Sequence, residues 1–311
     1  MKTLVATLAL VLAFDTALYA QEDWEAVAGG KMSFDVVSIR PSKEVVSIPA
    51  NVSMEIDDRY VPTGGIFSAD RTLETYINFA YKLHPTPEQR AAIYGSLPKW
   101  VTKQKFMILA RAPGNVRKKD QMRLMMQSLL AERFMLKVHF EQKEMAVFAL
   151  RVMRPGKLGP NLRPHIDGPS CNVPASKVGK SAAVGADVEP TGNQDFPFLC
   201  GQYSLMVEPN HLILWGSRDA SLATLATWIA VTPPRDLGRP VVDQTGLKGT
   251  YDFTLEWQWE PDSAAPANTE ERSSGPTVDE AVEEQLGLRL TPAKAPVPML
   301  VVDRVEMPTE N

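Results

Sequence analysis

The stretch Pro240–Leu255 reads PVVDQTGLKGTYDFTL, and it decides which kind of fold the sequence predicts. Two β-branched valines open it. Tyr251, Phe253 and Leu255 later alternate with polar residues, which is the period of a half-buried strand. The stretch therefore predicts a strand, a tight turn and a second strand. A helix over Val278–Leu286 and a strand at the C-terminal end follow it.

The turn in this stretch holds the candidate structural residues Asp243, Thr245, Gly246 and Gly249. The glycines supply the backbone freedom that a tight turn needs. Asp243 is expected to accept hydrogen bonds from turn N–H groups near Thr245. The alternative is a carboxylate pair of Asp243 and Asp252 for acid–base chemistry. We favour the structural interpretation.

Length and composition indicate an ordinary globular protein. A chain of 311 residues is long enough for two modest cores. It is 44% hydrophobic and 23% charged, and its net charge of −4 comes from interspersed residues of both signs. This balance argues against a nucleic-acid partner and against an anionic membrane surface.

The first twenty residues predict a Sec-type signal peptide. Lys2 is followed by the apolar run Leu4–Leu12, and the segment ends in Ala20 before polar residues. No later segment has the length of about 20 apolar residues that a spanning helix needs. We expect cleavage after about Ala20, no membrane span in the mature chain, and a periplasmic or secreted location.

The chain has two cysteines, Cys171 and Cys200, and both lie in one segment rich in Pro, Gly and Ser. In an exported protein such a pair favours a disulfide. Two free thiols or a metal pair remain alternatives. The four histidines show no metal-ligand spacing, so no metal and no cofactor is expected.

The predicted order of elements divides the chain into modules. Residues 33–153 form the first α+β module, and residues 154–200 are an insertion that includes both cysteines. Residues 201–311 form the second module, in which 261–276 is a mobile loop rich in Ser, Pro, Ala and Glu.

The same order of elements occurs twice, which predicts an internal repeat. Each copy runs strand, helix, strand segment, helix and closing hairpin. The first copy has helices at Leu73–Tyr81 and Gln121–Glu132 and a hairpin at Phe134–Met153. The second copy has helices at Leu222–Ile229 and Val278–Leu286 and a hairpin at Leu288–Val305. We predict two βαββαββ-like α+β modules, with the helices on one face of a mixed or antiparallel sheet.

No familiar catalytic motif is present, neither a His-Glu-x-x-His, a Gly-x-Ser-x-Gly, a P-loop nor a GxGxxG sequence. The aromatic residues that could line a ligand groove are Trp100, Trp228, Trp257 and Tyr251, although packing in the core explains most of them better. The basic run Arg117-Lys118-Lys119 is expected to be a solvated helix entry.

Several strings together resemble a family of uncharacterised exported proteins that is expanded in soil bacteria of the acidobacterial type. They are FDVVSIRPS, GSLPKW, LLAERFMLKVHFEQKEMAVFALRV, VVDQTGLKGTYDFTL, EQLGLRL and VVDRVEMPTEN. The resemblance spans nearly the whole mature chain and brings no catalytic residues. Related domains follow sensor-type membrane metallopeptidases, which implies an extracytoplasmic sensing or binding role. This chain lacks the zinc motif of those peptidases.

The repeat unit also resembles the short N-terminal module of secretins and TonB-dependent receptors. LKGTYDFTL and VDEAVEEQLGLRL follow its strand–helix order. This more remote resemblance implies protein–protein docking in the periplasm.

Three hypotheses for function follow. The first is a non-enzymatic exported protein that binds an envelope protein or an extracellular component. The second is a hydrolase with a site around Asp243 and Asp252. The third is a small-ligand sensor with an aromatic cleft between the modules.

Overall fold

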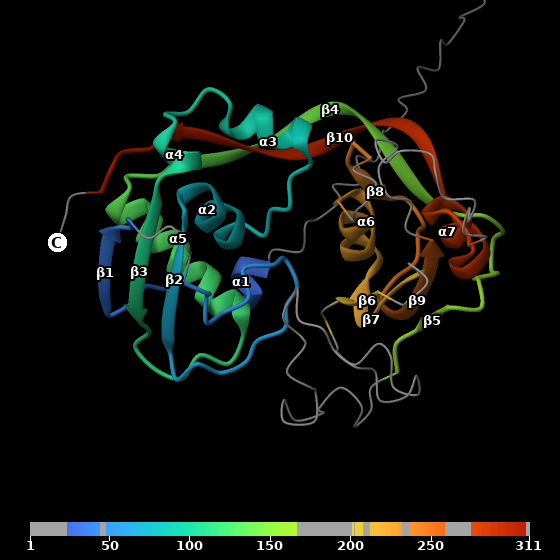
Figure 1. Cartoon of the computed structure of the whole chain (residues 1–311), viewed down its shortest axis with the longest axis horizontal. Coiled ribbons are helices and arrows are strands. Elements are labelled where there is room, and N and C mark those ends of the chain that lie inside the picture. The colour runs from blue at the N-terminus through green and yellow to red at the C-terminus, as the bar shows by residue number, and fades with distance from the viewer. Residues whose placement is uncertain are drawn as a thin grey trace, which may run out of the picture.

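The computed structural model describes residues 24–43, 48–166, 201, 203–207, 212–231, 237–258 and 275–308. Within them the chain is an α+β protein with three small, mostly antiparallel sheets. Figure 1 shows two lobes joined by a long two-stranded ribbon that arches over both. The cysteine pair and almost all of the predicted loop 261–276 lie outside the described residues, as does the predicted signal peptide.

The first lobe has a sheet in the order β1-β3-β2, with every pair antiparallel. Its strands are β1 (Val36–Pro41), β2 (Ile66–Thr72) and β3 (Lys105–Arg111). Helices α2 (Leu73–Ala80) and α5 (Lys119–Arg133) pack against the sheet, and the short helices are α1 (Trp24–Ala28), α3 (Pro87–Tyr94) and α4 (Trp100–Lys103).

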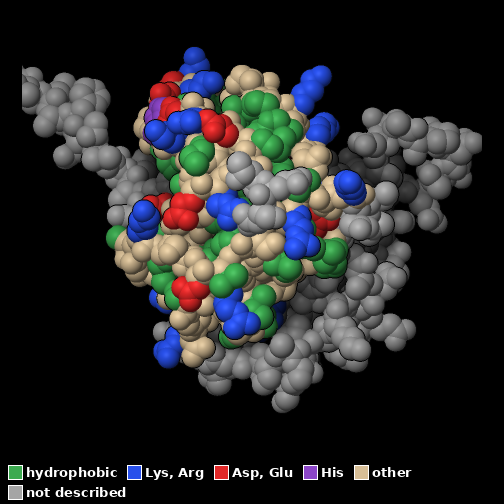
Figure 2. All heavy atoms as spheres, turned by 90° about the vertical axis from the view of Figure 1, so that its left-hand side faces the viewer, with side chains coloured by type: hydrophobic (Ala, Val, Ile, Leu, Met, Phe, Trp, Pro, Cys, Tyr) green, Lys and Arg blue, Asp and Glu red, His purple; other side chains and the backbone are tan. Residues whose placement is uncertain are grey.

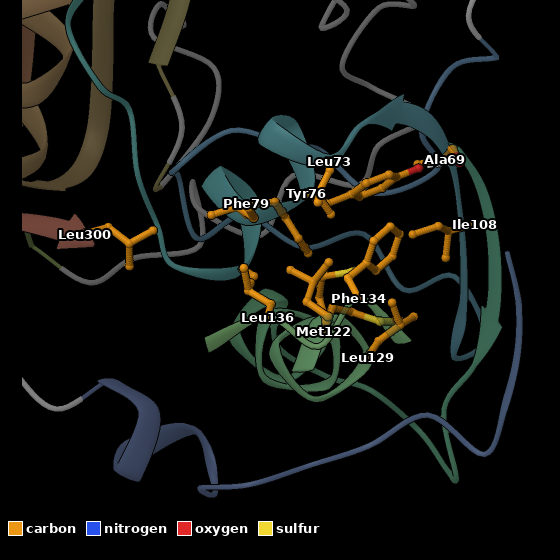
Figure 3. Packing of buried hydrophobic residues seen from close by; sticks show 14 of the residues in the cluster. Ala69, Leu73, Tyr76, Phe79, Ile108, Met122, Leu129, Phe134, Leu136 and Leu300 are labelled. Atoms are coloured by element: carbon orange, nitrogen blue, oxygen red, sulfur yellow. Dashed lines mark hydrogen bonds between the residues drawn. The ribbon is translucent and has the colours of Figure 1, made fainter. Parts of the chain in front are cut away.

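A hydrophobic cluster between the sheet and the two main helices forms the first core. Figure 3 shows Met122 and Phe134 between α2, α5 and the sheet, with the Tyr76 ring pointing toward Ala69 of the sheet. The Tyr76 hydroxyl lies 2.7 Å from the carbonyl oxygens of both Ala69 and Phe106 and accepts from Arg71 N at 3.2 Å, so its polar atom is satisfied inside the core. Leu300 reaches this core from the other end of the chain.

The segment Pro85-Thr86-Pro87 leads into helix α3. Thr86 caps the helix: its hydroxyl accepts from Gln89 N, and the Gln89 side chain accepts from Thr86 N at 3.0 Å. Pro87 occupies the first turn, where its missing N–H costs nothing. The Thr86-Pro87 pair thus marks the start of helix α3.

The second lobe has a sheet in the order β5-β9-β7-β6 with antiparallel pairs. Its strands are β5 (Leu162–Pro164), β6 (Tyr203–Val207), β7 (Leu212–Ser221) and β9 (Thr250–Gln258). Helices α6 (Leu222–Val231) and α7 (Val278–Leu286) complete it. Four aromatic residues pack around Trp215 in the core: Tyr203, Trp228, Phe253 and Trp257.

The ribbon joins the two lobes. Strand β4 (Lys137–Val152) pairs antiparallel with β10 (Leu288–Arg304), in one register from Leu288–Val152 to Val302–Val138. Each strand therefore contributes to both cores. Met145 and Val147 belong to the first hydrophobic cluster and Leu150 to the second.

Both predicted hairpins are wrong, since Phe134–Met153 and Leu288–Val305 each contain one continuous strand. A β-strand needs a partner edge, and here each strand finds it in the other half of the chain. The strand–turn–strand of Pro240–Leu255 has the predicted elements, but the two strands belong to different sheets. β8 (Val241–Asp243) pairs parallel with β4, and β9 pairs with β7 and β5.

Gly287 ends α7 in the left-handed conformation, with φ 68°. A Cβ at this position would lie 2.6 Å from the backbone nitrogen of Gly159. We expect Gly287→Ala to lower the free energy of unfolding by about 2 kcal/mol or more, as both the positive φ and the close approach oppose a side chain. Urea titration followed by circular dichroism measures this loss.

Gly246→Ala is the matched control for that substitution. Its φ of 71° is nearly the same, but nothing lies within 4 Å of the added Cβ. Gly246→Ala should lower the free energy of unfolding only by the cost of placing a side chain at positive φ, about 1 kcal/mol. Equal losses in the two variants would contradict the close approach between Gly287 and Gly159.

No helix within the described part of the chain is long and apolar enough to cross a membrane.

Candidate functional site: an ionic strap and a free strand edge

The predicted turn after β8 is built by side chain–backbone hydrogen bonds. Asp243 Oδ1 accepts from the backbone N of Thr245 at 2.9 Å and from its hydroxyl at 2.7 Å. The hydroxyl in turn accepts from Leu247 N at 3.2 Å. Gly246 and Gly249 both have positive φ, 71° and 82°. These residues shape the backbone between two sheets.

Asp252, the other carboxylate considered for acid–base chemistry, has its own partners. Its Oδ1 lies 2.6 Å from His165 Nδ1 and accepts from Asp219 N at 3.2 Å. Arg163 Nε lies 3.5 Å from Oδ2. Because Asp243 is engaged by Thr245 and Asp252 by these residues, the two carboxylates serve separate parts of the fold.

The four aromatic candidates pack inside the lobes. Trp228, Trp257 and Tyr251 are buried in the second core. Trp100 is half-buried and packs edge-on against Phe106, with ring centroids 6.2 Å apart. These positions correspond to core packing rather than to a ligand groove.

A cluster of buried charges that the sequence did not reveal holds residues 55–58 against α5. Lys119 and Asp57 form an ion pair at 3.1 Å, and their side chains are 0% and 1% exposed. Asp57 also accepts from Arg59 N at 3.1 Å. The prediction of a solvated helix entry at Lys119 is therefore wrong: this lysine lies inside the protein and neutralises a buried carboxylate.

Lys82, Asp58, Asp120 and Arg123 extend the cluster. Lys82 Nζ lies 2.8 Å from Asp58 and 3.0 Å from Asp120. The fully buried Arg123 pairs with both carboxylates and donates to the carbonyl oxygens of Glu55 and Asp57, at 3.0 and 2.7 Å. Together with Lys119 and Asp57, the cluster contains three basic and three acidic side chains, so its formal charges cancel.

Burial and neighbouring charges shift the pKa values in this cluster. Burial lowers the pKa of Lys119 to about 8, and the repulsion of Arg123 acts in the same direction while Asp57 opposes it. Burial opposes ionisation of Asp58, but the positive charges of Lys82 and Arg123 prevail and lower its pKa. Water thus reaches Lys119, Asp57 and Arg123 poorly, whereas Asp58 lies at the exposed side of the cluster.

The same segment touches the second lobe. Ile56 packs against the second hydrophobic cluster, while Asp57 beside it is paired in the first lobe. Burial, together with the negative charges of Glu55 and Asp57, raises the pKa of Tyr203 in β6 to about 12. We call residues 55–58 the ionic strap, since they contact both lobes.

The N-terminal half of β4 is exposed along the ribbon. All six side chains from His139 to Glu144 are exposed. Phe148 N and Leu150 O bond toward β8. Because N–H and C=O groups alternate in direction along a strand, those of Phe140, Gln142 and Glu144 also face away from β10.

Those outward groups have no hydrogen-bond partner within the described residues, where β8 covers only Phe148–Leu150. We call residues 138–146 the free edge of β4. Such an edge is a template for pairing with another strand.

The opposite edge of the ribbon is closed to pairing. Pro292, Pro296 and Pro298 of β10 lie opposite Phe148, Glu144 and Gln142. Opposed residues in an antiparallel pair are of the same hydrogen-bonding type, so these prolines stand where an N–H would face outward. Three missing donors on one edge disfavour the addition of a strand there, whereas the free edge of β4 contains no proline.

His139 bridges two carboxylates beside this edge. Its Nε2 lies 3.0 Å from Glu141 and its Nδ1 3.0 Å from Asp303 on β10. The hydrogen bond to Glu141, followed in size by the one to Asp303, raises the pKa of the imidazole. Across the described ranges, no group of three or more His, Cys, Asp and Glu side chains is placed to hold a metal ion.

The outer face of the first lobe carries mixed charge. Figure 2 shows Lys and Arg scattered among Asp and Glu, with hydrophobic side chains in separate groups between them. This visible face offers no large surface of one sign for a polyanion.

Comparison with known proteins gives one match. No curated protein and no solved structure matches the chain. A family model described as a protein of unknown function, DUF3738, matches residues 74–305. That span includes most of the first lobe, the ribbon and the second lobe, and therefore the chain belongs to the DUF3738 family.

Proposed function

We propose that this protein is exported and works without catalysis, by docking another extracytoplasmic polypeptide through strand addition along the free edge of β4. The observation that carries the proposal is the contrast between the two edges of one ribbon. β10 carries three outward prolines, and β4 keeps outward N–H groups at Phe140, Gln142 and Glu144. Main-chain hydrogen bonds to such an edge supply affinity, and neighbouring side chains supply specificity.

Export is part of the proposal and rests on the N-terminal segment. Lys2, the apolar run Leu4–Leu12 and the small residue Ala20 have the order of a signal peptide. An oxidising compartment would also suit a disulfide between Cys171 and Cys200. The partner would then be an envelope protein or an extracellular component.

We further propose that the two halves are copies of one unit. The hydroxyls of Thr72 and Ser221, before α2 and α6, each accept from the N–H three residues on. Met135 and Gly287, just after α5 and α7, both have positive φ, 49° and 68°. β4 and β10 are then equivalent strands, and Pro292 and Pro296 stand where β4 has Phe140 and Glu144. If the two halves are copies, β4 and β10 have equivalent edges, and prolines close only the edge of β10.

Gln142→Pro tests docking at the free edge. Proline removes the outward N–H but no bond to β10, so the ladder should survive, whereas binding to an added strand should weaken at least about tenfold. Wild-type and variant proteins are used as bait for envelope extracts. A protein that is retained is then produced separately and titrated by calorimetry.

Gln142→Ala is the matched control, because it removes the same side chain and keeps the N–H group. Its affinity should equal that of the wild type, and both variants should melt within a few degrees of it. Equal affinity of the Pro and Ala variants for every partner, a second copy of this chain included, would refute strand addition at this edge.

A further inference from the structure

The free edge of β4 has a charge pattern that is complementary to itself. Glu141 and Lys143 flank Gln142, and all three side chains are exposed. In an antiparallel pair of two identical strands, the residues on either side of the central one lie opposite each other. With Gln142 at the centre, Glu141 of one copy faces Lys143 of the other, and the symmetry repeats this pair.

The hydrogen-bonding geometry fits the same centre. Gln142 directs its N–H and C=O groups outward, so two copies can exchange both bonds at the symmetry axis. Phe140 and Glu144 face outward as well and would pair with each other across the axis. The outward groups of five consecutive even-numbered residues, from Val138 to Ala146, are then satisfied.

Neighbouring registers are disfavoured by charge. Centres at Glu141, Lys143 or Glu144 place that residue opposite its own copy, which brings like charges together. A centre at Phe140 places Lys137 opposite Lys143. Of the five possible centres from residue 140 to residue 144, only Gln142 gives a register in which opposite charges face each other and no like charges do.

We propose that the polypeptide bound at the free edge of β4 is a second copy of this chain, paired antiparallel with Gln142 on the two-fold axis. This inference rests on the proposed function, since it names the partner for the same edge. Two-fold dimers are the commonest closed assembly, and their interface must be complementary to itself. The closed edge of β10 ends the resulting four-stranded ribbon on both sides and prevents further growth.

A charge-exchange experiment tests the pairing. Sedimentation equilibrium of the exported full chain should show a dimer. Glu141→Lys and Lys143→Glu, each alone, should weaken dimerisation by about tenfold, because each creates two like-charge pairs across the axis. The double variant E141K/K143E restores two opposite-charge pairs and should recover dimerisation to within about threefold of the wild type.

Lys294→Glu is the matched control, an exposed charge reversal on β10 of the same ribbon that leaves the β4 edge unchanged. It should not alter dimerisation. A wild type that stays monomeric, or a double variant as weak as either single one, overturns the second copy as partner. Binding of a different protein that Gln142→Pro abolishes, with the wild type monomeric, overturns this inference and leaves the proposed function standing.

Discussion

Asp57→Ala should lower the free energy of unfolding by about 3–5 kcal/mol, since it leaves the Lys119 ammonium buried without its counterion. The two side chains are 0% and 1% exposed, so water cannot solvate the remaining charge. Urea unfolding followed by circular dichroism measures the loss. Arg289→Ala removes an exposed ion pair with Glu283 and serves as the control, with an expected change much smaller than that of Asp57→Ala.

The destabilisation of Asp57→Ala should shrink as the pH rises. The pKa of Lys119 in the fold is about 8, against an ordinary value of 10.5. Between these values the unfolded chain binds more protons at this group than the folded one, so its contribution makes stability rise with pH. Removing Asp57 lowers the pKa of Lys119 in the folded chain further. The pH range over which Lys119 makes stability rise therefore begins at a lower pH in the variant. The loss should therefore shrink as the pH rises to about 8, and a loss that stays constant from pH 6 to pH 8 would show that Lys119 is not the buried charge responsible.

Trp215→Ala should cost about 3–5 kcal/mol, because it empties the centre of the second core. Trp215 is 2% exposed and packs against Tyr203, Trp228, Phe253 and Trp257. Trp215→Phe retains most of the ring contacts and should cost less than half as much. Chemical denaturation of the three proteins gives the comparison, and similar losses for Ala and Phe would contradict this packing.

The loss at Trp215 should also reach the first lobe. β4 and β10 contribute Val147 and Leu300 to the first core and Leu150 and Leu288 to the second, so neither core is complete without the ribbon. Hydrogen exchange of β3 in the first lobe reports this coupling. Its protection should fall by a similar factor to that of β9, whereas unchanged protection in β3 would show that the lobes unfold independently.

Helices α2, α5, α6 and α7 and most strands could be predicted from the sequence, because their signals are local. The apolar stripe of α5 and the alternation of Tyr251, Phe253 and Leu255 in β9 each decide a conformation within a few residues. The turn at Asp243 follows from the hydrogen bonds that a short carboxylate makes to nearby N–H groups. These elements give the α+β class correctly.

The ionic strap could not be found in the same way. Lys119 belongs to a basic run before a helix, and such runs are normally solvated. Its burial depends on Asp57, which lies 62 residues earlier and is brought there by the path of the chain over α5. No local pattern distinguishes a lysine that meets a carboxylate in the core from one that meets water.

The sequence by itself determined the four helices α2, α5, α6 and α7 and most strands of this protein, because backbone preference and hydrophobic period act over single turns and residue pairs. Only the tertiary structure decided how the strands pair, since the period of a strand is the same whichever edge it meets. The sequence therefore predicted two local hairpins where β4 and β10 each form one continuous strand. In the folded chain the prolines of β10 stand at the outward positions of a continuous strand, where their missing N–H groups break no bond and keep that edge unpaired.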